Sequence, residues 1–499
     1  MGEMARTRWL LAGLGLLFVA AALSAPINHD ESQYVAAIAM MREGLPYRDW
    51  PYLQTPLQPL LLSPLSLLPA GWLLVGARLA NVLFALVTCW ALMRFLADRV
   101  PYWVRVATVV GLATTNAFLF GTEVARNDML PAALLALGLL AILPNDMMPH
   151  WRRTGIAGLC FGLAISAKIS MALPVAGAGL WMLLRARRLG WPALAAAAAG
   201  GLAGILPSIA LYALSPERFT FGVLTYSLIA PQLYWTGVGE AWRLQPLGKL
   251  GGIAEQMIKG APAVALLLTL VTLRRRARQR LLEIMAVGGL IAAFLPDPFF
   301  KQYLVPLLPP LFARAGIALP TLEQRWRHAA LAAGALCSLY GVAGTILAIS
   351  KAVTGASPLW QAVERGRAVA AAADGGTVVT LAPEQFVGVD VELHPGFTAG
   401  PFLYRIEGEP GRFVRRVTEV PTFESLHLLD VARPAVVVTG GERKQFPPEL
   451  PLGLDGPLDQ WAGARGYRKV ELPGTAWWMW IAPTQKGGPE GPPSGVTLP

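Results

Sequence analysis

Long apolar runs alternate with short polar segments through the first 350 residues of the chain. A hydropathy window of about 19 residues is suited to finding membrane-spanning helices. This window predicts eleven helices, at residues 9–27, 73–94, 106–121, 129–144, 155–169, 171–185, 192–213, 256–273, 281–296, 302–319 and 329–350. The runs at 155–169 and 171–185 are short for spanning helices, so two short helices and one long broken helix both remain open.

Composition agrees with a membrane location. Of the 499 residues, 54% are hydrophobic and only 15% are charged, whereas soluble domains have about 25% charged residues. The net charge of +11 comes from arginine clusters between apolar runs. Such clusters are typical of cytoplasmic loops rather than of a nucleic-acid surface. The chain is therefore predicted to be a polytopic α-helical membrane protein, with membrane lipids and not nucleic acid as partners.

The positions of the arginines predict the topology. With a cytoplasmic N-terminus and eleven crossings, the cluster "RRRARQR" at 274–280 lies on the cytoplasmic side. Merging the runs at 155–185 into one helix would move this cluster outside, which favours eleven crossings. The first run could instead be a signal peptide, although only "LSAP" resembles a cleavage site. We expect a multi-pass protein of the cell inner (cytoplasmic) membrane, whose outer side carries the loops 28–72, 122–128, 214–251 and 296–302 and everything after about Ile349.

The predicted domain organisation has three parts. Residues 1–352 form the transmembrane domain, 353–483 a periplasmic α/β domain, and 484–499 a Gly/Pro-rich disordered tail. The expected elements of the second part are a helix at 358–373 and strands within 377–383, 434–441 and 476–482.

The outer loop 28–72 has structure of its own. Apolar residues recur at helical spacing from Ser32 to Glu43, and a second apolar stretch at 56–69 is interrupted by prolines. We expect two helices lying in the outer membrane interface. They would cover the acidic pair Asp30 and Glu31, which stands where the first apolar run ends.

Charged residues gather at the predicted outer helix ends. Asp30 and Glu31 could simply favour the dipole of the helix that follows them. However, other outer ends carry Arg126, Asn127, Asp128, Lys168, Lys301, Gln302 and Tyr303. Ionisable groups at membrane depth are costly and are usually paired or functional. Carboxylates that accept a proton and cations that hold a leaving phosphate suit group transfer from an anionic lipid carrier.

Four stretches carry a family resemblance. They are "DESQY…G…PYRDWPYLQTPLQPLL", "ARNDMLPAALLALGLL", "GLCFGLAISAKISMALP" and "KQYLVPLLPPLFARAGIAL". In this order they resemble the GT-C glycosyltransferases, especially the branch of the lipid A aminoarabinose transferases and the protein O-mannosyltransferases, over residues 25 to 320. The resemblance implies a GT-C fold, a polyprenyl-phosphate-linked sugar donor, and inverting transfer on the outer face.

The resemblance also implies residue roles. Asp30 matches the candidate catalytic base, with Glu31 and Asp128 as the other acidic positions of the cavity. Lys168, Lys301 and Tyr303 match positions near the donor phosphate. Two departures are Gln33 at a basic position and "QTP" at 54–56 in place of "EKP". Phosphate binding is therefore expected to draw also on Arg126 and on Arg243 or Lys249, and substrate binding on His29, Tyr34, Gln54, Asn127 and Gln302.

Several alternatives stay open at the sequence level. A transporter or flippase of a lipid-linked sugar precursor would place ionisable groups in the middle of several helices, where this chain has almost none. A glycan ligase that uses a diphosphate carrier is a near alternative. The acceptor could be a lipid, a glycan or a protein. Two carboxylates facing a phosphate leave room for a divalent cation, Mg²⁺ or Mn²⁺, but no set of metal ligands stands out.

Overall fold

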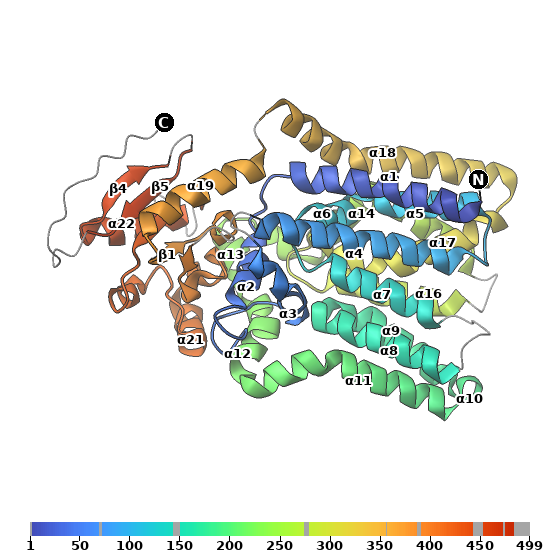
Figure 1. Cartoon of the computed structure of the whole chain (residues 1–499). Coiled ribbons are helices and arrows are strands. Elements are labelled where there is room, and N and C mark those ends of the chain that lie inside the picture. The colour runs from blue at the N-terminus through green and yellow to red at the C-terminus, as the bar shows by residue number, and fades with distance from the viewer. Residues whose placement is uncertain are drawn as a thin grey trace.

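The computed structural model describes residues 2–68, 72–142, 150–273, 279–355, 357–386, 391–442, 453–472 and 475–483. Long helices lie side by side in a bundle, and a β-sheet with its own helices lies beyond one end of them (Figure 1). We call that end of the bundle the sheet-side end. The predicted tail at 484–499 and most of the cluster at 274–280 lie outside the described residues.

Each predicted apolar run contains a helix of the bundle, but α14 (Pro246–Ile258) begins inside the predicted outer loop 214–251. The bundle helices are α1 (Glu3–Ser24), α4 (Leu73–Leu96), α5 (Tyr102–Ala113), α6 (Asn116–Glu123), α7 (Met129–Ile142), α8 (His150–Ala167), α9 (Ala172–Leu184), α11 (Trp191–Leu214), α14 (Pro246–Ile258), α15 (Pro262–Val271), α16 (Arg280–Phe294), η7 (Lys301–Leu307), α17 (Leu308–Ala318) and α18 (Gln324–Thr354). The runs at 155–169 and 171–185 form separate helices, α8 and α9, joined through the short η2 (Ile169–Met171).

Fewer of these helices than predicted are long enough to cross a membrane. By length and composition, five spans qualify within the described ranges, namely α1, α4, α11, η7 with α17, and α18. The number rises to seven if the bent pairs α5–α6 and α14–α15 each count as one span. Helices α7 and α9 are apolar but shorter. The predicted count of eleven full spans is therefore not confirmed.

The two bent pairs meet at their breaks. Helices α5 and α6 bend by 65°, and α14 and α15 by 96°. Gly260 has a φ of +125°, and a Cβ there would lie 2.6 Å from the Cα of Thr115. Pro262 then opens α15, a position where its missing N–H costs nothing. The Asn116 N–H, at the α5–α6 break, donates to the Lys259 carbonyl, at the α14–α15 break, at 2.9 Å. One backbone donor and one backbone acceptor left free by the two breaks thus pair with each other.

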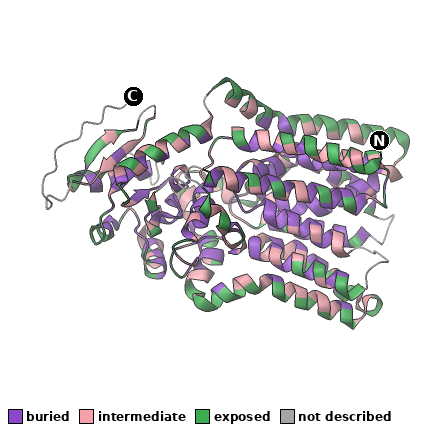
Figure 2. Cartoon of the chain, viewed as in Figure 1, coloured by how far each residue is buried: buried purple, intermediate pink, exposed green. Residues whose placement is uncertain are grey.

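Burial follows the position of each helix in the bundle. The window of the η7–α17 segment is 83% buried, whereas the windows of α11 and α18 are 17% buried. Figure 2 shows this contrast between the inner helices and the exposed outer faces of α11 and α18. Apolar helices with so much exposed surface are typical of helices that face lipid.

Short helices lie between the bundle and the sheet (Figure 1). The loop 28–72 forms α2 (Glu31–Met40), α3 (Leu57–Leu62) and η1 (Ser63–Leu67), close to the predicted pair of helices. The loop 214–251 adds α12 (Pro216–Thr220), η3 (Phe221–Thr225), α13 (Tyr226–Gly237) and η4 (Ala241–Leu244).

The C-terminal region contains a five-stranded sheet in the order β2-β1-β3-β5-β4. Its strands are β1 (Thr377–Thr380), β2 (Glu392–Leu393), β3 (Val436–Thr439), β4 (Arg468–Glu471) and β5 (Trp478–Ile481). Strand β1 is parallel to β2 and β3, and β5 is antiparallel to β3 and β4. Side chains alternate between faces, so Val436 and Val438 pack with α19 (Pro358–Ala373), while Val437 packs with α22 (Gly456–Ala464).

Candidate active site

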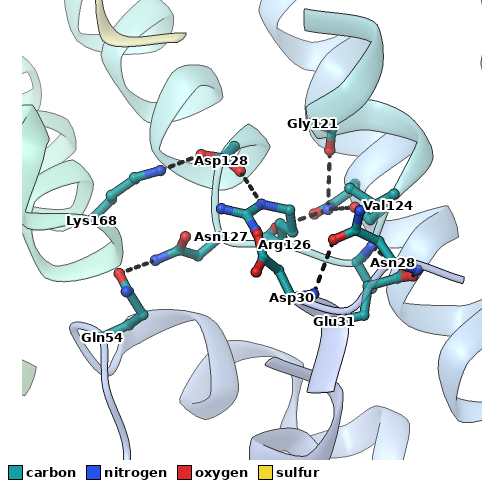
Figure 3. Close-up of polar contacts among 12 residues, drawn as sticks. Asn28, Asp30, Glu31, Gln54, Gly121, Val124, Arg126, Asn127, Asp128 and Lys168 are labelled. Atoms are coloured by element: carbon teal, nitrogen blue, oxygen red, sulfur yellow. Dashed lines mark hydrogen bonds and ion pairs between the residues drawn. The ribbon is translucent and has the colours of Figure 1, made fainter. Parts of the chain in front are cut away.

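Two connections meet at the sheet-side end, the start of α2 and the loop between α6 and α7 (Figure 3). Arg126 from that loop forms an ion pair with Asp30, and its Nε donates to Oδ2 of Asp128 at 3.0 Å. Lys168, which follows α8, forms an ion pair with the other oxygen of Asp128. Four charges thus alternate along one line, from Asp30 through Arg126 and Asp128 to Lys168, and we call these residues the charge cluster.

The two aspartates of the charge cluster differ in access. The Asp128 side chain is fully buried, whereas the Asp30 side chain is 30% exposed. Burial by itself would raise the pKa of the Asp128 carboxyl, but the charges of Lys168 and Arg126 outweigh it and hold that pKa below its usual value. Asp128 is therefore a buried counter-charge, and Asp30 is the carboxylate of the charge cluster that is partly exposed.

Several polar groups hold Arg126 in place. Its backbone carbonyl accepts hydrogen bonds from Asn81 Nδ2 at 2.8 Å and from Gln58 Nε2 at 3.0 Å. Its guanidinium lies 5.4 Å from the ring centre of Tyr34 and 5.7 Å from that of Phe120. Because the loop backbone and the side chain are both fixed, the Arg126 charge is preorganised beside Asp30.

Glu31 has a different environment from its neighbour Asp30. Its carboxylate pairs with Arg78 of α4 at 2.7 Å, and both side chains are fully buried. It also accepts the backbone N–H of Ala125 at 2.6 Å and of Asn28 at 2.7 Å. Arg78 in turn donates to the carbonyls of Ala22 and Ala25. Glu31 therefore ties α1, α2, α4 and the α6–α7 loop together.

Most of the other predicted residues lie around the charge cluster. Lys168 Nζ is 5.6 Å from the Tyr303 ring centre, and Lys301 Nζ is 3.9 Å from that of Phe120. Gln302 is buried in η7. Asn127 donates to the Ala167 carbonyl at 3.1 Å and to Gln54 Oε1 at 3.3 Å.

His29 faces the C-terminal region instead. Its Nδ1 lies 2.5 Å from Oε1 of Glu442, and its ring packs edge-on against Phe402 at 4.9 Å between centres. His29 thus connects the residue before Asp30 to the segment that follows β3.

Arg243 and Lys249 have partners of their own. Arg243 pairs with Glu240 at 2.6 Å and lies 4.8 Å from the Trp235 ring centre. Lys249 pairs with Asp297 at 2.7 Å. Within the described part of the chain, neither has a contact with the charge cluster. No group of three or more His, Cys, Asp or Glu side chains in these ranges has a geometry that could hold a metal ion.

The sequence reasoning missed Arg78 and Asn81. Both lie in α4, inside an apolar run, and both are fully buried. A polar or ionisable residue within a membrane helix is itself a signal, because it needs a buried partner. That signal was available in the sequence, but the partners, Glu31 and the α6–α7 loop, were not.

Comparisons with known proteins agree with this architecture. Residues 52–298 match the model of glycosyltransferase family 87. The structure is similar to ArnT from Cupriavidus metallidurans bound to undecaprenyl phosphate, with a TM-score of 0.62 and 14% identity over 98% of this chain and 100% of that chain. The apo state of that ArnT matches with a TM-score of 0.63 and 15% identity, over 97% of this chain and 100% of that chain. The apo form of the Archaeoglobus fulgidus oligosaccharyltransferase matches with a TM-score of 0.50 and 12% identity, over 86% of this chain and 69% of that chain.

No curated protein sequence matches the chain significantly. At 12–15% identity the structural matches establish the fold, and the family match adds the class of activity. The predicted resemblance to the GT-C glycosyltransferases is thereby confirmed: residues 52–298 match a glycosyltransferase family, and the chain shares the fold of ArnT.

Proposed function

We propose that this enzyme transfers a sugar from a polyprenyl-phosphate carrier to an acceptor hydroxyl on the outer face of the membrane, with inversion. The observation that carries this proposal is the position of Asp30, partly exposed and held by a buried arginine at the end of the charge cluster. The similar ArnT structure with undecaprenyl phosphate supports a lipid phosphate as the donor carrier.

Asp30 is the proposed general base. The acceptor oxygen attacks the anomeric carbon, its proton passes to the Asp30 carboxylate, and the bond from that carbon to the phosphate oxygen breaks. The lipid phosphate leaves with the bonding electrons, opposite the attacking oxygen, which inverts the anomeric centre. The proposed contacts of the leaving phosphate are the Tyr303 hydroxyl and Lys301, which has the Glu123 carboxylate nearby but forms no close ion pair within the described residues, with Lys168 and Arg126 behind them.

The distribution of arginines supports an outer location for this site. The N-terminus of α1 and the arginine-containing α10 (Ala186–Leu189) lie at the end of the bundle away from the sheet (Figure 1). Lys and Arg are enriched on the cytoplasmic side of membrane proteins. The sheet-side end would then face outward, and the C-terminal region would be periplasmic.

Purified full-length protein in lipid nanodiscs, incubated with a panel of polyprenyl-phosphate hexoses and pentoses, tests the proposal. We expect free polyprenyl phosphate to be released together with a glycosylated acceptor. Release of polyprenyl diphosphate from diphosphate-linked glycans would indicate a ligase instead. Movement of the intact donor across the bilayer without cleavage would indicate a flippase and would contradict the proposal.

A further inference from the structure

Arg405 is a cation of the C-terminal region that contacts α13, one of the short helices between the bundle and the sheet. It follows α20 (Pro401–Tyr404), and its guanidinium lies 4.3 Å from the ring centre of Tyr234 and 5.0 Å from that of Phe402. The Tyr226 hydroxyl interacts with this guanidinium and donates to the Phe402 carbonyl at 3.2 Å. Since His29 packs on the Phe402 ring, Phe402 connects Arg405 to the residue next to Asp30.

The charge cluster has no positive charge to spare. Arg126 lies between Asp30 and Asp128, and Lys168 pairs with Asp128. Two carboxylates and two cations sum to zero, whereas a phosphate brings one or two negative charges. A buried cation that already serves a carboxylate gains little from a second anion. A phosphate at this end of the bundle therefore needs cations beyond the charge cluster, and Lys301 supplies only one of them.

Most nearby cations are also occupied. Arg78, Arg243, Lys249 and Lys259 each pair with an acidic side chain. Arg405, by contrast, forms no ion pair with a carboxylate of the described ranges, and its Nε is buried without a hydrogen-bond partner. The stacking on Tyr234 restricts the guanidinium to one plane, which lowers the entropy lost when an anion binds.

We propose that Arg405, whose guanidinium the Tyr226 hydroxyl helps to position, binds a phosphate group of a substrate at the sheet-side end. An arginine fork can donate two parallel hydrogen bonds to a phosphate, and the unpartnered Nε–H supplies one of them. The inference rests on the proposed function in that a phosphate-bearing lipid enters this site. That phosphate belongs either to the sugar donor or to an acceptor, and binding measurements distinguish these two sources.

The test compares full-length wild type with Arg405→Gln, Arg405→Lys and the control Arg412→Gln. Arg412 is exposed in the neighbouring α21 (Gly408–Thr418) and pairs only with Glu409 in the described chain. The probes are undecaprenyl phosphate, dioctanoyl phosphatidylglycerol and, as the uncharged control, undecaprenol. A donor phosphate at Arg405 predicts that Arg405→Gln weakens undecaprenyl phosphate binding by about 10-fold or more, in line with a charge-assisted hydrogen bond. Arg405→Lys should recover part of the affinity.

An acceptor phosphate at Arg405 predicts weaker phosphatidylglycerol binding with undecaprenyl phosphate binding unchanged. If wild type binds either phospholipid and Arg405→Gln binds both as tightly, the inference fails while the proposed function stands. If wild type binds neither phosphate lipid and releases no polyprenyl phosphate from any donor, both fail together. A folded Arg405→Lys variant keeps the test decisive should Arg405→Gln not fold.

Discussion

Asp30 and Asp128 contact the same arginine, but only Asp30 has exposed side-chain surface. Asp128 is enclosed between Arg126 and Lys168 with no exposed surface, whereas 30% of the Asp30 side chain is open. A general base must come within hydrogen-bond distance of the proton that it accepts. The environments therefore assign the proposed base role to Asp30 and a structural role to Asp128.

Replacing Asp30 with Asn should lower the turnover rate by about 10²- to 10⁴-fold, since the amide cannot accept the hydroxyl proton. The variant keeps the size of the side chain, so donor affinity should change little. Transfer kinetics with the donor identified in the panel, and binding of undecaprenyl phosphate, measure the two quantities.

Glu43→Gln is the matched control for Asp30→Asn, because it removes an exposed carboxylate of the same loop that lies outside the charge cluster. It should keep wild-type turnover. Normal turnover in Asp30→Asn would exclude Asp30 as the base.

The buried ion pair of Glu31 and Arg78 holds α2 against α4 beside the charge cluster. Arg78→Met would leave the fully buried Glu31 carboxylate without its cation, and such losses cost about 3–5 kcal/mol. We expect a lower melting temperature and aggregation in detergent, measured by fluorescence-detected size-exclusion chromatography. The double variant Glu31→Gln/Arg78→Met removes both charges and should recover part of the loss. A single variant as stable as wild type would mean that the pair is not needed for folding.

At the scale of elements, glycines set the approach of α8 and α11. A Cβ on Gly158 or Gly162 would collide with the backbone of α11, and one on Gly200 or Gly204 with the backbone of α8. Small residues four apart allow membrane helices to pack with their backbones in contact. Such packing does not need a polar interface, which suits two helices in an apolar solvent.

Gly200→Ala should lower the melting temperature, because its Cβ would collide with the Gly155 carbonyl oxygen. Alanine normally makes a helix about 1 kcal/mol more stable than glycine does. A lower melting temperature would therefore come from the collision with α8 and not from helix propensity. Gly334→Ala in α18 is the control, since its Cβ would meet no atom within 4 Å. Equal or higher stability in Gly200→Ala would show that the helices can separate without cost.

At the scale of the whole molecule, the C-terminal region packs directly on the start of α2. His29 contacts Glu442, and a Cβ on Gly400, whose φ is +58°, would lie 2.9 Å from Ser32 Oγ. Glu442 is in turn held by Asp455, which accepts its backbone N–H at 2.7 Å. Changes in the sheet region can therefore reach the residues next to Asp30.

Asp455 makes this region sensitive to pH. Burial raises the pKa of its carboxyl to about 7, although the N–H groups of Glu442 and Gly440 oppose the shift. The unfolded chain releases this proton near pH 3.9, so the free energy of unfolding falls as pH rises from about 4 to about 7, by at most about 1.4 kcal/mol per pH unit. Above pH 7 both states are ionised and the loss is complete.

Asp455→Asn should therefore lose less thermal stability than wild type between pH 5 and pH 8. The tryptophan fluorescence of the full-length protein measures the thermal transition, and Trp480 of β5, which donates to Asp459, is one of the reporters in this region. Parallel changes in melting temperature for the two proteins would contradict a titrating Asp455.

The local pattern of residues determined much of the architecture. Each predicted apolar run contains a helix, and the predicted helix at 358–373 coincides with α19. Both could be predicted because the spacing of apolar residues along a short stretch of sequence indicates which helix face is buried. Strand β4 was not predicted, because its sequence "RKVE" has little apolar alternation. It forms a strand because it pairs with β5. The breaks in α5–α6 and α14–α15 were missed too, because each depends on the other.

The sequence alone determined that acidic and basic residues gather at helix ends, and that Asp30 and Glu31 follow the first apolar run. Only the tertiary structure decided their partners. Arg126, the partner of Asp30, lies 96 positions away from it in sequence, and Arg78, the partner of Glu31, lies 47 positions away. Hydrophobic periodicity is a local property of the chain, whereas an ion pair depends on which distant segments pack together, and so adjacent residues with similar chemistry came to have opposite environments.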